Sequence, residues 1–405
     1  MAIGLPSIDD DLFSREAVLD ARAVDDRLRE LAPVVWLNRE KIALLGRWEH
    51  VSEGLRDWET FSNTSRPWHN PNSVRPEILL TDDPPEHTRV RGIIASALSP
   101  RQLNRMQDHF RQVAAEQVDA LLARSGEQID AVADITAPFV HKVLPDIIGM
   151  PDKGRDQMTA FGHAVWATMG PMNALFDEAM VGAEPLLQWA AWACAREQLD
   201  PDSLGMHMYL AADRGEITPQ EAHLLVMTIL SAGADTTVIT MANAIRAFCA
   251  FPDQWKILQA DPGLLRNAFD EALRWDSPSR LAGRITMKDV EIEDSRSGGG
   301  AAGGTKYLIP AGTRCGLMFA AANRDPRKWA DPDRFDIRRD PRGQLGWGYG
   351  IHSCVGRTLA QLEAEALFGA LIERIDRFEA AGDPQWWITT IGHGPAKLPI
   401  RFHAF

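Results

Sequence analysis

The feature that most constrains this chain is a glycine-rich stretch at residues 347–356, which reads Trp-Gly-Tyr-Gly-Ile-His-Ser-Cys-Val-Gly. It places Cys354 on a tight loop, and the apolar residues that follow recur at helical spacing as far as Leu371. A thiol just before a helix N-terminus lies near unpaired backbone N–H groups and the positive end of the peptide dipoles. Both favour the thiolate, the form that binds metal. The glycines leave room for a flat ligand to approach the sulfur.

The loop alone leaves two other interpretations of this cysteine open. Most isolated cysteines are buried thiols that behave as small apolar side chains. A zinc site using His352 and Cys354 is the second interpretation, but zinc needs further ligands. The remaining cysteines, Cys194, Cys249 and Cys315, are scattered and form no Cys-x-x-Cys pair.

This loop resembles the cysteine-ligand loop of the cytochrome P-450 family, the haem-thiolate monooxygenases. The family pattern is Phe-x-x-Gly-x-x-x-Cys-x-Gly, and Trp347 stands here in the place of Phe. The residues that fit it are Gly348, Gly350, His352, Cys354 and Gly356. The resemblance implies haem b (iron protoporphyrin IX) as cofactor and Cys354 as the metal ligand. It also implies a mostly α fold with small β-sheets, a triangular helical bundle around a buried haem.

Composition and charge exclude several other classes of protein. The 405 residues are 45% hydrophobic and 24% charged, as in ordinary globular proteins, and the net charge of −13 argues against nucleic acid as a partner. The N-terminal residues have neither a basic start nor an apolar core, so no signal peptide or membrane anchor is expected. Unpaired cysteines indicate a reducing cytoplasm. We expect one domain, 1–405, β-rich near its N-terminus, with the haem between the central long helix and the helix after Cys354.

Local patterns predict where helices and strands lie. Helical spacing dominates from Ser99 to Phe251 and from Cys354 to Phe378. Residues 297–304 form a glycine-rich, low-complexity segment that we interpret as a surface insertion. The strand-like runs are Val34–Trp36, Ile42–Leu45, Val290–Ile292, Tyr307–Ile309, Arg314–Met318 and Leu398–Phe402.

A second motif, Ala-Gly-Ala-Asp-Thr-Thr at 232–237, lies within a long helical pattern. The helix opens on a capping box at 218–221 with proline at its first position, and it is predicted to run to about Phe251. An Asp within so apolar a helix is costly unless it is paired or solvated, although a polar stripe facing another element would also explain it. The resemblance implies that Asp235 and Thr236 deliver protons for oxygen activation, and that Ala232 and Gly233 form an oxygen-binding kink.

The third motif is Glu271-Ala-Leu-Arg274, whose two charged side chains share one helix face. Most Glu-x-x-Arg pairs are surface ion pairs worth little. The resemblance implies instead a buried structural pair, with Arg334 from a downstream loop as its third member.

Four cationic residues complete the family pattern. His87 and Arg91 share a helix face, Arg284 follows the Glu-x-x-Arg helix, and His352 precedes Cys354 by two. Each alone would be a solvated surface charge. The resemblance assigns all four to the haem propionates, where charge-assisted hydrogen bonds favour Arg and His.

The residues expected in the substrate pocket are mostly apolar. They are His69, Trp166, Met169, Met227, Ser231, Ala232 and Gly283. The chain resembles most the bacterial subgroup that oxidises para-substituted benzoates, but His69 and Met227 replace arginines of that group and Gly283 replaces a bulky Phe. We therefore expect hydroxylation or O-demethylation of a small aromatic, such as a methoxyphenol or methoxybenzoate. A terpenoid hydroxylase is the alternative within the family.

The chain has no flavin or iron–sulfur motif, so its electrons must come from outside. The resemblance implies a ferredoxin and a ferredoxin reductase that uses NAD(P)H, docking where Arg101, Arg105 and Arg357 supply positive charge, with O2 as co-substrate and the enzyme a monomer. A peroxygenase would not need the Asp235–Thr236 pair. Neither would a haem-based electron carrier, and a gas sensor would need an output domain.

Overall fold

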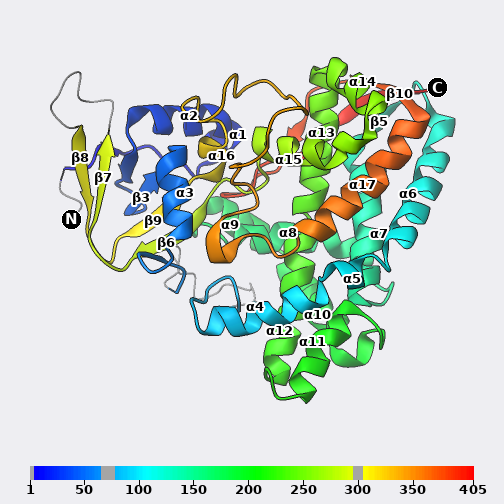
Figure 1. Cartoon of the computed structure of the whole chain (residues 1–405), viewed down its shortest axis with the longest axis horizontal. Coiled ribbons are helices and arrows are strands. Elements are labelled where there is room, and N and C mark those ends of the chain that lie inside the picture. Colours follow the sequence, from blue (N-terminus) through cyan, green and yellow to red (C-terminus); the bar gives the residue numbers. More distant parts are fainter. Residues whose placement is uncertain (1–3, 65–77, 295–303) are drawn as a thin grey trace.

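The computed structural model describes residues 4–64, 78–294 and 304–405. The largest sheet and the β7–β8 hairpin lie at one end of the molecule, and the long helices lie at the other together with β5 and β10 (Figure 1). The α-helices are α1 Arg15–Leu19, α2 Ala21–Leu31, α3 Trp48–Arg56, α4 Glu86–Ala97, α5 Pro100–Leu103, α6 Gln107–Leu121, α7 Ala137–Ile148, α8 Met158–Ala167, α9 Ala174–Met180, α10 Ala183–Ala193, α11 Leu204–Asp213, α12 Pro219–Gly233, α13 Thr236–Ala250, α14 Pro252–Ala260, α15 Leu265–Trp275, α16 Phe319–Ala322 and α17 Arg357–Arg374.

Short non-α turns connect several of these helices. They are η1 Leu122–Arg124, η2 Ala131–Thr136, η3 Arg155–Gln157, η4 Arg196–Gln198, η5 Pro262–Leu264 and η6 Gly350–His352. The strands are β1 Ser7–Ile8, β2 Val34–Leu37, β3 Ile42–Leu45, β4 Phe61–Ser62, β5 Gln128–Asp130, β6 Ala282–Thr286, β7 Val290–Asp294, β8 Thr305–Ile309, β9 Arg314–Leu317, β10 Ile375–Ala380, β11 Gln385–Trp386, β12 Pro395–Lys397 and β13 Pro399–Ala404.

The largest sheet joins segments from both ends of the chain. Its strand order is β1-β2-β3-β9-β6-β4, and β3 pairs with β9 in parallel while β9 pairs with β6 in antiparallel fashion. Smaller sheets are formed by β10-β13-β5, β11-β12 and the β7-β8 hairpin. Because β6 lies inside the largest sheet, the segment that carries Gly283 and Arg284 is held rigidly. The prediction of a mostly α fold with small sheets is confirmed.

The central helix begins as predicted but is interrupted. Thr218 Oγ1 accepts the Glu221 N–H at 3.1 Å, and Glu221 Oε2 accepts the Thr218 N–H at 2.7 Å, which completes the capping box. The helix does not continue unbroken to Phe251: α12 ends at Gly233 and α13 begins at Thr236. Side-chain hydroxyls bond to backbone carbonyls at this break, Thr236 to Ala232 at 2.8 Å.

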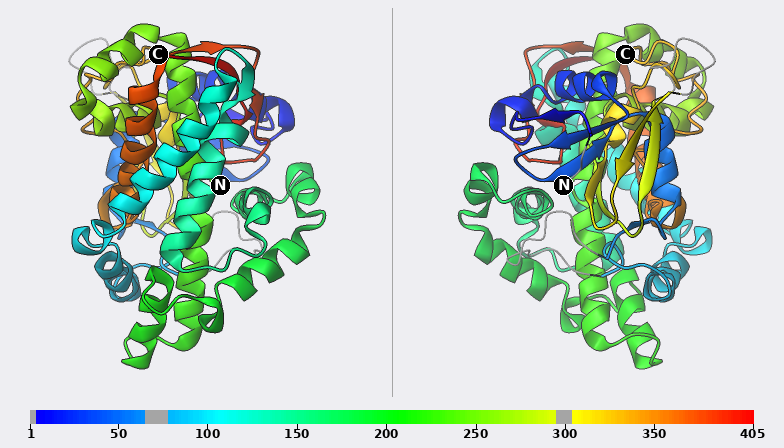
Figure 2. Two further views of the ribbon diagram at one scale, coloured as in Figure 1. Left: turned by 90° about the vertical axis from the view of Figure 1, so that its right-hand side faces the viewer. Right: turned by 90° about the vertical axis from the view of Figure 1, so that its left-hand side faces the viewer.

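The run Pro219–Ala250, taken as one helix, is long and apolar enough to cross a membrane by length and composition alone. Within the protein, however, 67% of its most apolar window is buried. The central helix of a folded core passes the same test, so this run is weak evidence for a membrane span. Figure 2 shows it between α4 and α17 on one side and α8–α10 on the other.

The predicted strands form, whereas one predicted helical end does not. Residues 375–378 were expected to extend the helix after Cys354, but α17 ends at Arg374 and β10 begins at Ile375. Ile375 and Phe378 are three apart, a spacing that suits a helix, and both are buried in the strand. The segment forms a strand because β10 pairs with β13 at the C-terminus, with Phe378 opposite Phe402. The local spacing of apolar residues cannot show a contact with so distant a segment.

Candidate active site

A cavity of about 360 Å³ lies between the Cys354 loop, the α12–α13 break and β6. The segments that meet here are far apart in the sequence. The lining residues that the sequence singled out are Trp166, Met169, Ala232, Thr236, Gly283, Arg284, Gly348, His352 and Cys354.

The Cys354 loop is a tight turn held by its backbone. The Cys354 N–H donates to the Trp347 carbonyl at 2.6 Å. Gly350 has a φ of +68°, and a Cβ at this position would lie 2.6 Å from the Leu55 carbonyl oxygen. Glycine is therefore required at this position both by backbone conformation and by the close approach of α3.

Cys354 lies deep in the protein, and its side chain is exposed because it lines the cavity. Burial raises the pKa of the thiol, while N–H groups of Gly356 and Arg357 and the positive charges of Arg91 and Arg357 lower it. The loop and the helix start thus favour the thiolate as predicted, but burial is the larger effect. The thiolate consequently needs a cation such as a bound metal ion, which deprotonates a thiol ligand outright.

The four predicted cationic residues gather beside this cavity. The rings of His87 and His352 lie 4.3 Å apart, Arg284 lines the cavity, and Arg91 donates to the Ser353 carbonyl at 2.6 Å. Burial, followed by the charges of Arg284, His87 and Arg91, lowers the pKa of His352 to about 3. Burial also lowers the pKa of Arg284 to about 10. Among the described residues, both ring nitrogens of His87 and Nε2 of His352 are buried without a hydrogen-bond partner.

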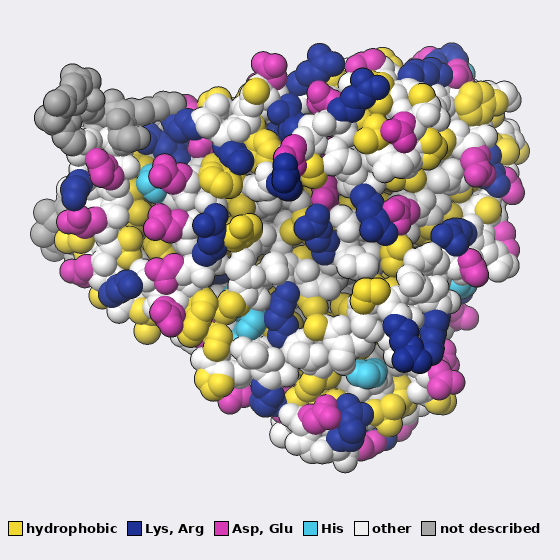
Figure 3. All heavy atoms as spheres, viewed as in Figure 1, with side chains coloured by type: hydrophobic (Ala, Val, Ile, Leu, Met, Phe, Trp, Pro, Cys, Tyr) yellow, Lys and Arg dark blue, Asp and Glu magenta, His cyan; other side chains and the backbone are white. Residues whose placement is uncertain are grey.

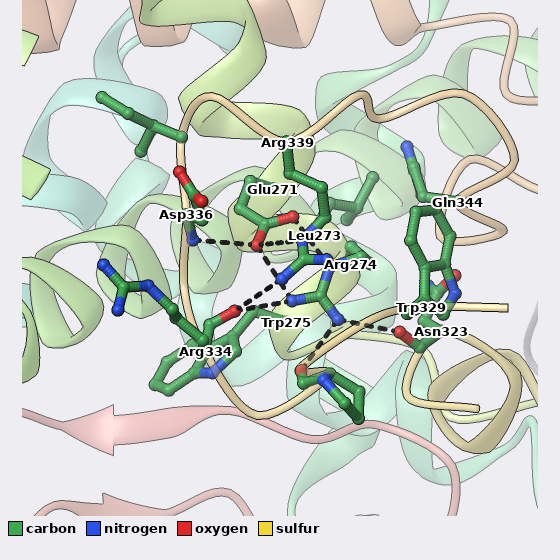
Figure 4. Close-up of polar contacts among 12 residues, drawn as sticks. Glu271, Leu273, Arg274, Trp275, Asn323, Trp329, Arg334, Asp336, Arg339 and Gln344 are labelled. Carbon is green, nitrogen blue, oxygen red and sulfur yellow. Dashed lines mark hydrogen bonds and ion pairs between the residues drawn. The ribbon is translucent and has the colours of Figure 1, made fainter. Parts of the chain in front are cut away.

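The Glu271–Arg274 pair is fully buried, with both side chains 0% exposed (Figure 4). Arg274 donates Nε and Nη2 to the two carboxylate oxygens at 2.7 and 2.9 Å. Its remaining donors bond to the carbonyls of Asn323, Pro332 and Arg334 at 2.9–3.1 Å. The interpretation as a surface ion pair is therefore excluded, and the helix α15 is tied to the downstream loop.

The prediction that Arg334 is the third member of this group is wrong for its side chain. Only its carbonyl takes part, and the guanidinium points away from Glu271 towards Asp253, at 3.5 Å, with 54% of the side chain exposed (Figure 4). Arg339 takes that place, donating Nε to Glu271 Oε1 at 3.1 Å. The loop turns between these two arginines, so sequence position alone could not choose between them.

Asp235 and Thr236 lie at the break between α12 and α13. Thr236 lines the cavity, whereas Asp235 is 1% exposed and its Oδ2 has no hydrogen-bond partner among the described residues. Burial raises the pKa of this carboxyl well above its ordinary value. It packs so closely on α8 that a Cβ at Gly162 would lie 1.3 Å from Oδ2. Burial thus favours the protonated form of Asp235, which lies beside a cavity-lining hydroxyl.

Two residues expected in the pocket lie outside it, and one cannot be placed. Met227 is packed in the hydrophobic core, and the Ser231 hydroxyl bonds to the Thr228 carbonyl at 3.2 Å. Neither lines the cavity, because Ala232 is the α12 residue that faces it, and positions one and five residues earlier lie on other faces of the helix. His69 lies outside the described residues, as do residues 297–303 of the glycine-rich segment.

Comparisons with known proteins agree with this geometry. The family model described as cytochrome P-450 matches residues 195–386. Cytochrome p-450 CYP199A2 of Rhodopseudomonas palustris is 36% identical over 408 residues, covering 98% of this chain and 95% of the relative. The chain belongs to the cytochrome P-450 family. Vitamin D(3) 25-hydroxylase of Pseudonocardia autotrophica is another relative, 31% identical and covering 94% of this chain and 92% of its own.

A solved structure shows that the cytochrome P-450 fold extends over the whole chain. Cytochrome P-450 CYP109Q5 from Chondromyces apiculatus superposes with a TM-score of 0.78 at 28% identity, covering 98% of this chain and 99% of the other. The chain is therefore a cytochrome P-450 monooxygenase, an oxidoreductase. Members of the family use haem and O2 and take electrons from redox partners.

The residues of this cytochrome P-450 fit a haem. Buried, unpartnered ring nitrogens of His87 and His352, together with Arg284, offer donors to two carboxylates. Cys354 lies on the same cavity and can ligate the iron. A zinc site does not fit, because among residues 4–64, 78–294 and 304–405 no three His, Cys, Asp or Glu side chains gather to hold a metal.

Three further residues of this cytochrome P-450 were missed from the sequence. Arg339 completes the Glu271 group, and Asp270 hydrogen-bonds Trp347 at 2.6 Å. His141 on α7 bonds to the carbonyl of Ala234 at the helix break, and burial lowers its pKa to about 4, so it is neutral. Asp270 directly precedes the Glu271-x-x-Arg274 motif. It could have been found by asking which cation neutralises a second carboxylate at that place. Nothing in the sequence points to the other two.

Proposed function

We propose that this monooxygenase inserts one oxygen atom from O2 into a small aromatic substrate, by hydroxylation or O-demethylation of a compound such as a methoxyphenol or methoxybenzoate. The observation that carries the monooxygenase reaction is the meeting of two groups across one cavity. Cys354, His352 and Arg284 line it from the Cys354 loop and β6, which form one wall, and Thr236, next to Asp235, lines it from the α12–α13 break, which forms the other.

Each wall has a separate task in this proposal. Cys354 ligates the haem iron, and His87, Arg91, Arg284 and His352 hold the propionates. When bound, the haem supplies the redox chemistry of O2 activation. Asp235 carries a proton on its carboxyl, and the Thr236 hydroxyl is a hydrogen-bonding group at the surface of the cavity.

The substrate assignment rests on the character of the cavity. Trp166, Met169 and Ala232 give apolar contacts, and Gly283 leaves space beside Arg284. Since Met227 lies in the core, α12 supplies no cation to a substrate carboxylate from this position. These features favour a neutral aromatic such as a methoxyphenol over a benzoate, with a terpenoid as the competing class.

A spectral binding titration separates these substrates. The purified protein is titrated with 4-methoxybenzoate, methoxyphenols and monoterpenes while the iron spin state is followed by absorption. We expect the methoxyphenols to shift the spin state with the lowest dissociation constant. A shift with terpenoids or larger rings alone would overturn the aromatic assignment.

We further propose that a ferredoxin and an NAD(P)H-dependent ferredoxin reductase supply the electrons to a monomeric, cytoplasmic enzyme. Support comes from the exposed side chains of Arg101, Arg105 and Arg357 in a chain of net charge −13.

The reduced, CO-bound absorption spectrum tests the haem-thiolate assignment directly. The native protein should show the strongly red-shifted Soret band that reports a thiolate ligand. Cys354→Ala should abolish this band, whereas Cys315→Ala, at a buried thiol on β9, should retain it. A red-shifted band in the Cys354→Ala protein would refute the assignment.

A further inference from the structure

Trp347 commits its indole N–H to a buried carboxylate. Its Nε1 donates to Asp270 Oδ1 at 2.6 Å, and Gln361 Nε2 donates to the same oxygen at 3.2 Å. Asp270 lies on α15 beside Glu271, and 5% of its side chain is exposed. The Trp347 ring also lines the cavity that contains Cys354. The ring orientation at this wall therefore depends on Asp270.

The second oxygen of this carboxylate binds a residue that reaches solvent. Arg357 Nη2 donates to Asp270 Oδ2 at 2.7 Å, and 50% of the Arg357 side chain is exposed. The guanidinium also lies 5.7 Å from the centre of the Trp347 ring. Asp270 thus links an interior indole to a half-exposed cation at the start of α17.

Charges in this group reach the sulfur. Arg357 follows Cys354 by three residues, and the Cys354 N–H donates to the Trp347 carbonyl at 2.6 Å. Within a protein, neighbouring charges interact more strongly than they do in water. Any change in the pairing of Arg357 is accordingly felt at Cys354.

The surface around this group suits an acidic partner. The start of α17 faces the viewer in Figure 1, and Lys and Arg side chains predominate across the middle of that face in Figure 3. Arg101 on α5 and Arg105 just after it are exposed and form no ion pair among those given for the described residues. In a chain of net charge −13, this face attracts a negatively charged protein.

We propose that Asp270 is a positioning residue that transmits the docking of an acidic electron donor from Arg357 to Trp347 and Cys354. A donor carboxylate that pairs with Arg357 weakens its hold on Asp270. More negative charge then remains beside the Trp347 indole and the Cys354 sulfur. The proposal rests on the proposed haem-thiolate function, because it concerns the environment of that ligand.

The first experiment measures the reduction potential of the haem-loaded protein by spectroelectrochemistry. Asp270→Asn removes a negative charge while keeping an acceptor for Trp347, so the potential should rise. Arg357→Gln removes a positive charge, so the potential should fall. Arg105→Gln, on the same face without contact to Asp270, should leave it unchanged. Shifts of the same sign, or none, would show that Asp270 only supports the fold. If Asp270→Asn fails to fold, Trp347→Phe takes its place, because it removes the indole donor to Asp270 and leaves Arg357 unchanged: the potential should fall, and no shift would overturn the relay.

The second experiment adds poly-L-glutamate as an acidic probe of the docking face. At saturation the probe should lower the potential of the native protein and of Arg105→Gln equally, although Arg105→Gln should bind it several-fold more weakly. It should have no effect on Arg357→Gln, and an equal effect on that variant would overturn the proposal. The reduced, CO-bound spectrum of each variant is recorded in parallel. A retained red-shifted band with no potential shift refutes the relay alone, whereas its absence in the native protein refutes the proposed function.

Discussion

The two walls of the cavity, one at the Cys354 loop and one at the α12–α13 break, differ in whether their buried carboxyl groups have cationic partners. On the Cys354 side, Glu271 is held by Arg274 and Arg339, and Asp270 by Arg357. On the α12–α13 side, Asp235 is equally buried, but its Oδ2 has no partner and it forms no ion pair among the described residues. The two carboxylates on the Cys354 side have cationic partners, whereas burial favours the protonated form of Asp235.

This difference separates two regions with different tasks. We call the ion-paired residues Asp270, Glu271, Arg274 and Arg339 the frame, and Asp235 and Thr236 at the helix break the working surface. Arg274 uses its donors on one carboxylate and three carbonyls, so α15 and the loop that follows α16 cannot move independently. Glu363 on α17 also forms no ion pair with any residue that the structure describes, but burial raises its pKa to about 8, so at neutral pH it is mostly uncharged. The wall that holds the metal ligand therefore carries no unpaired buried anion, and the wall facing it keeps a proton available.

Breaking the frame should have the largest effect. Glu271→Gln leaves Arg274 and Arg339 as buried cations without their anion, which should cost about 3–5 kcal/mol of unfolding free energy. Arg334→Gln is the matched control, since its side chain is exposed, and it should change stability by less than about 0.5 kcal/mol. Urea denaturation measures both. Equal losses would mean that the Arg334 side chain is part of the frame after all.

Altering the working surface should leave the fold intact and change the reaction. Thr236→Ala removes the cavity-lining hydroxyl, so haem and substrate binding should persist while reducing equivalents are diverted to hydrogen peroxide. Thr240→Val, one turn along and also on the cavity, should affect product yield much less. Product and peroxide are counted per NAD(P)H consumed. An unchanged product yield in Thr236→Ala would remove Thr236 from the proposed role.

The smallest effect should be a pH-dependent stability difference at Asp235. Its pKa is raised in the folded state, so the folded protein binds this proton more tightly than the unfolded chain. That contribution is fully present below the unfolded value of 3.8 and is lost as pH rises towards the folded value. Asp235→Asn should therefore gain in melting temperature relative to the native protein as pH rises above about 4. A difference that stays constant with pH would mean that Asp235 is ionised in the folded state.

Local sequence was sufficient where a turn or a helix start determines the geometry. The glycines around Cys354 and the capping box at 218–221 depend on neighbouring residues, and both form as predicted. The spacing of apolar residues continues to Phe251 and does not locate the helix break, although the family resemblance placed a kink at Ala232 and Gly233, where α12 ends. Its position depends on packing against α7, where a Cβ at Gly233 would lie 3.0 Å from Leu144.

Contacts between distant segments account for what the sequence could not show. The choice of Arg339 over Arg334 depends on how an irregular loop returns to α15. The role of Asp270 requires α15, the Cys354 loop and α17 to meet at one carboxylate. Neither arrangement leaves a periodic pattern, so no reading of spacing would predict it. The pocket prediction was wrong for Met227 and Ser231 because they lie on faces of α12 other than the one on which Ala232 meets the cavity.

The packing of Gly162 against Asp235 gives protein engineers a means of reshaping the pocket from behind. A methyl group at position 162 would overlap the carboxylate, so Gly162→Ala must displace either Asp235 or α8. Trp166, which lines the cavity, is also on α8. A shift of α8 caused by the added methyl group would therefore move a wall of the pocket without changing any residue that lines it. Directed evolution of this enzyme could therefore begin at a residue outside the cavity.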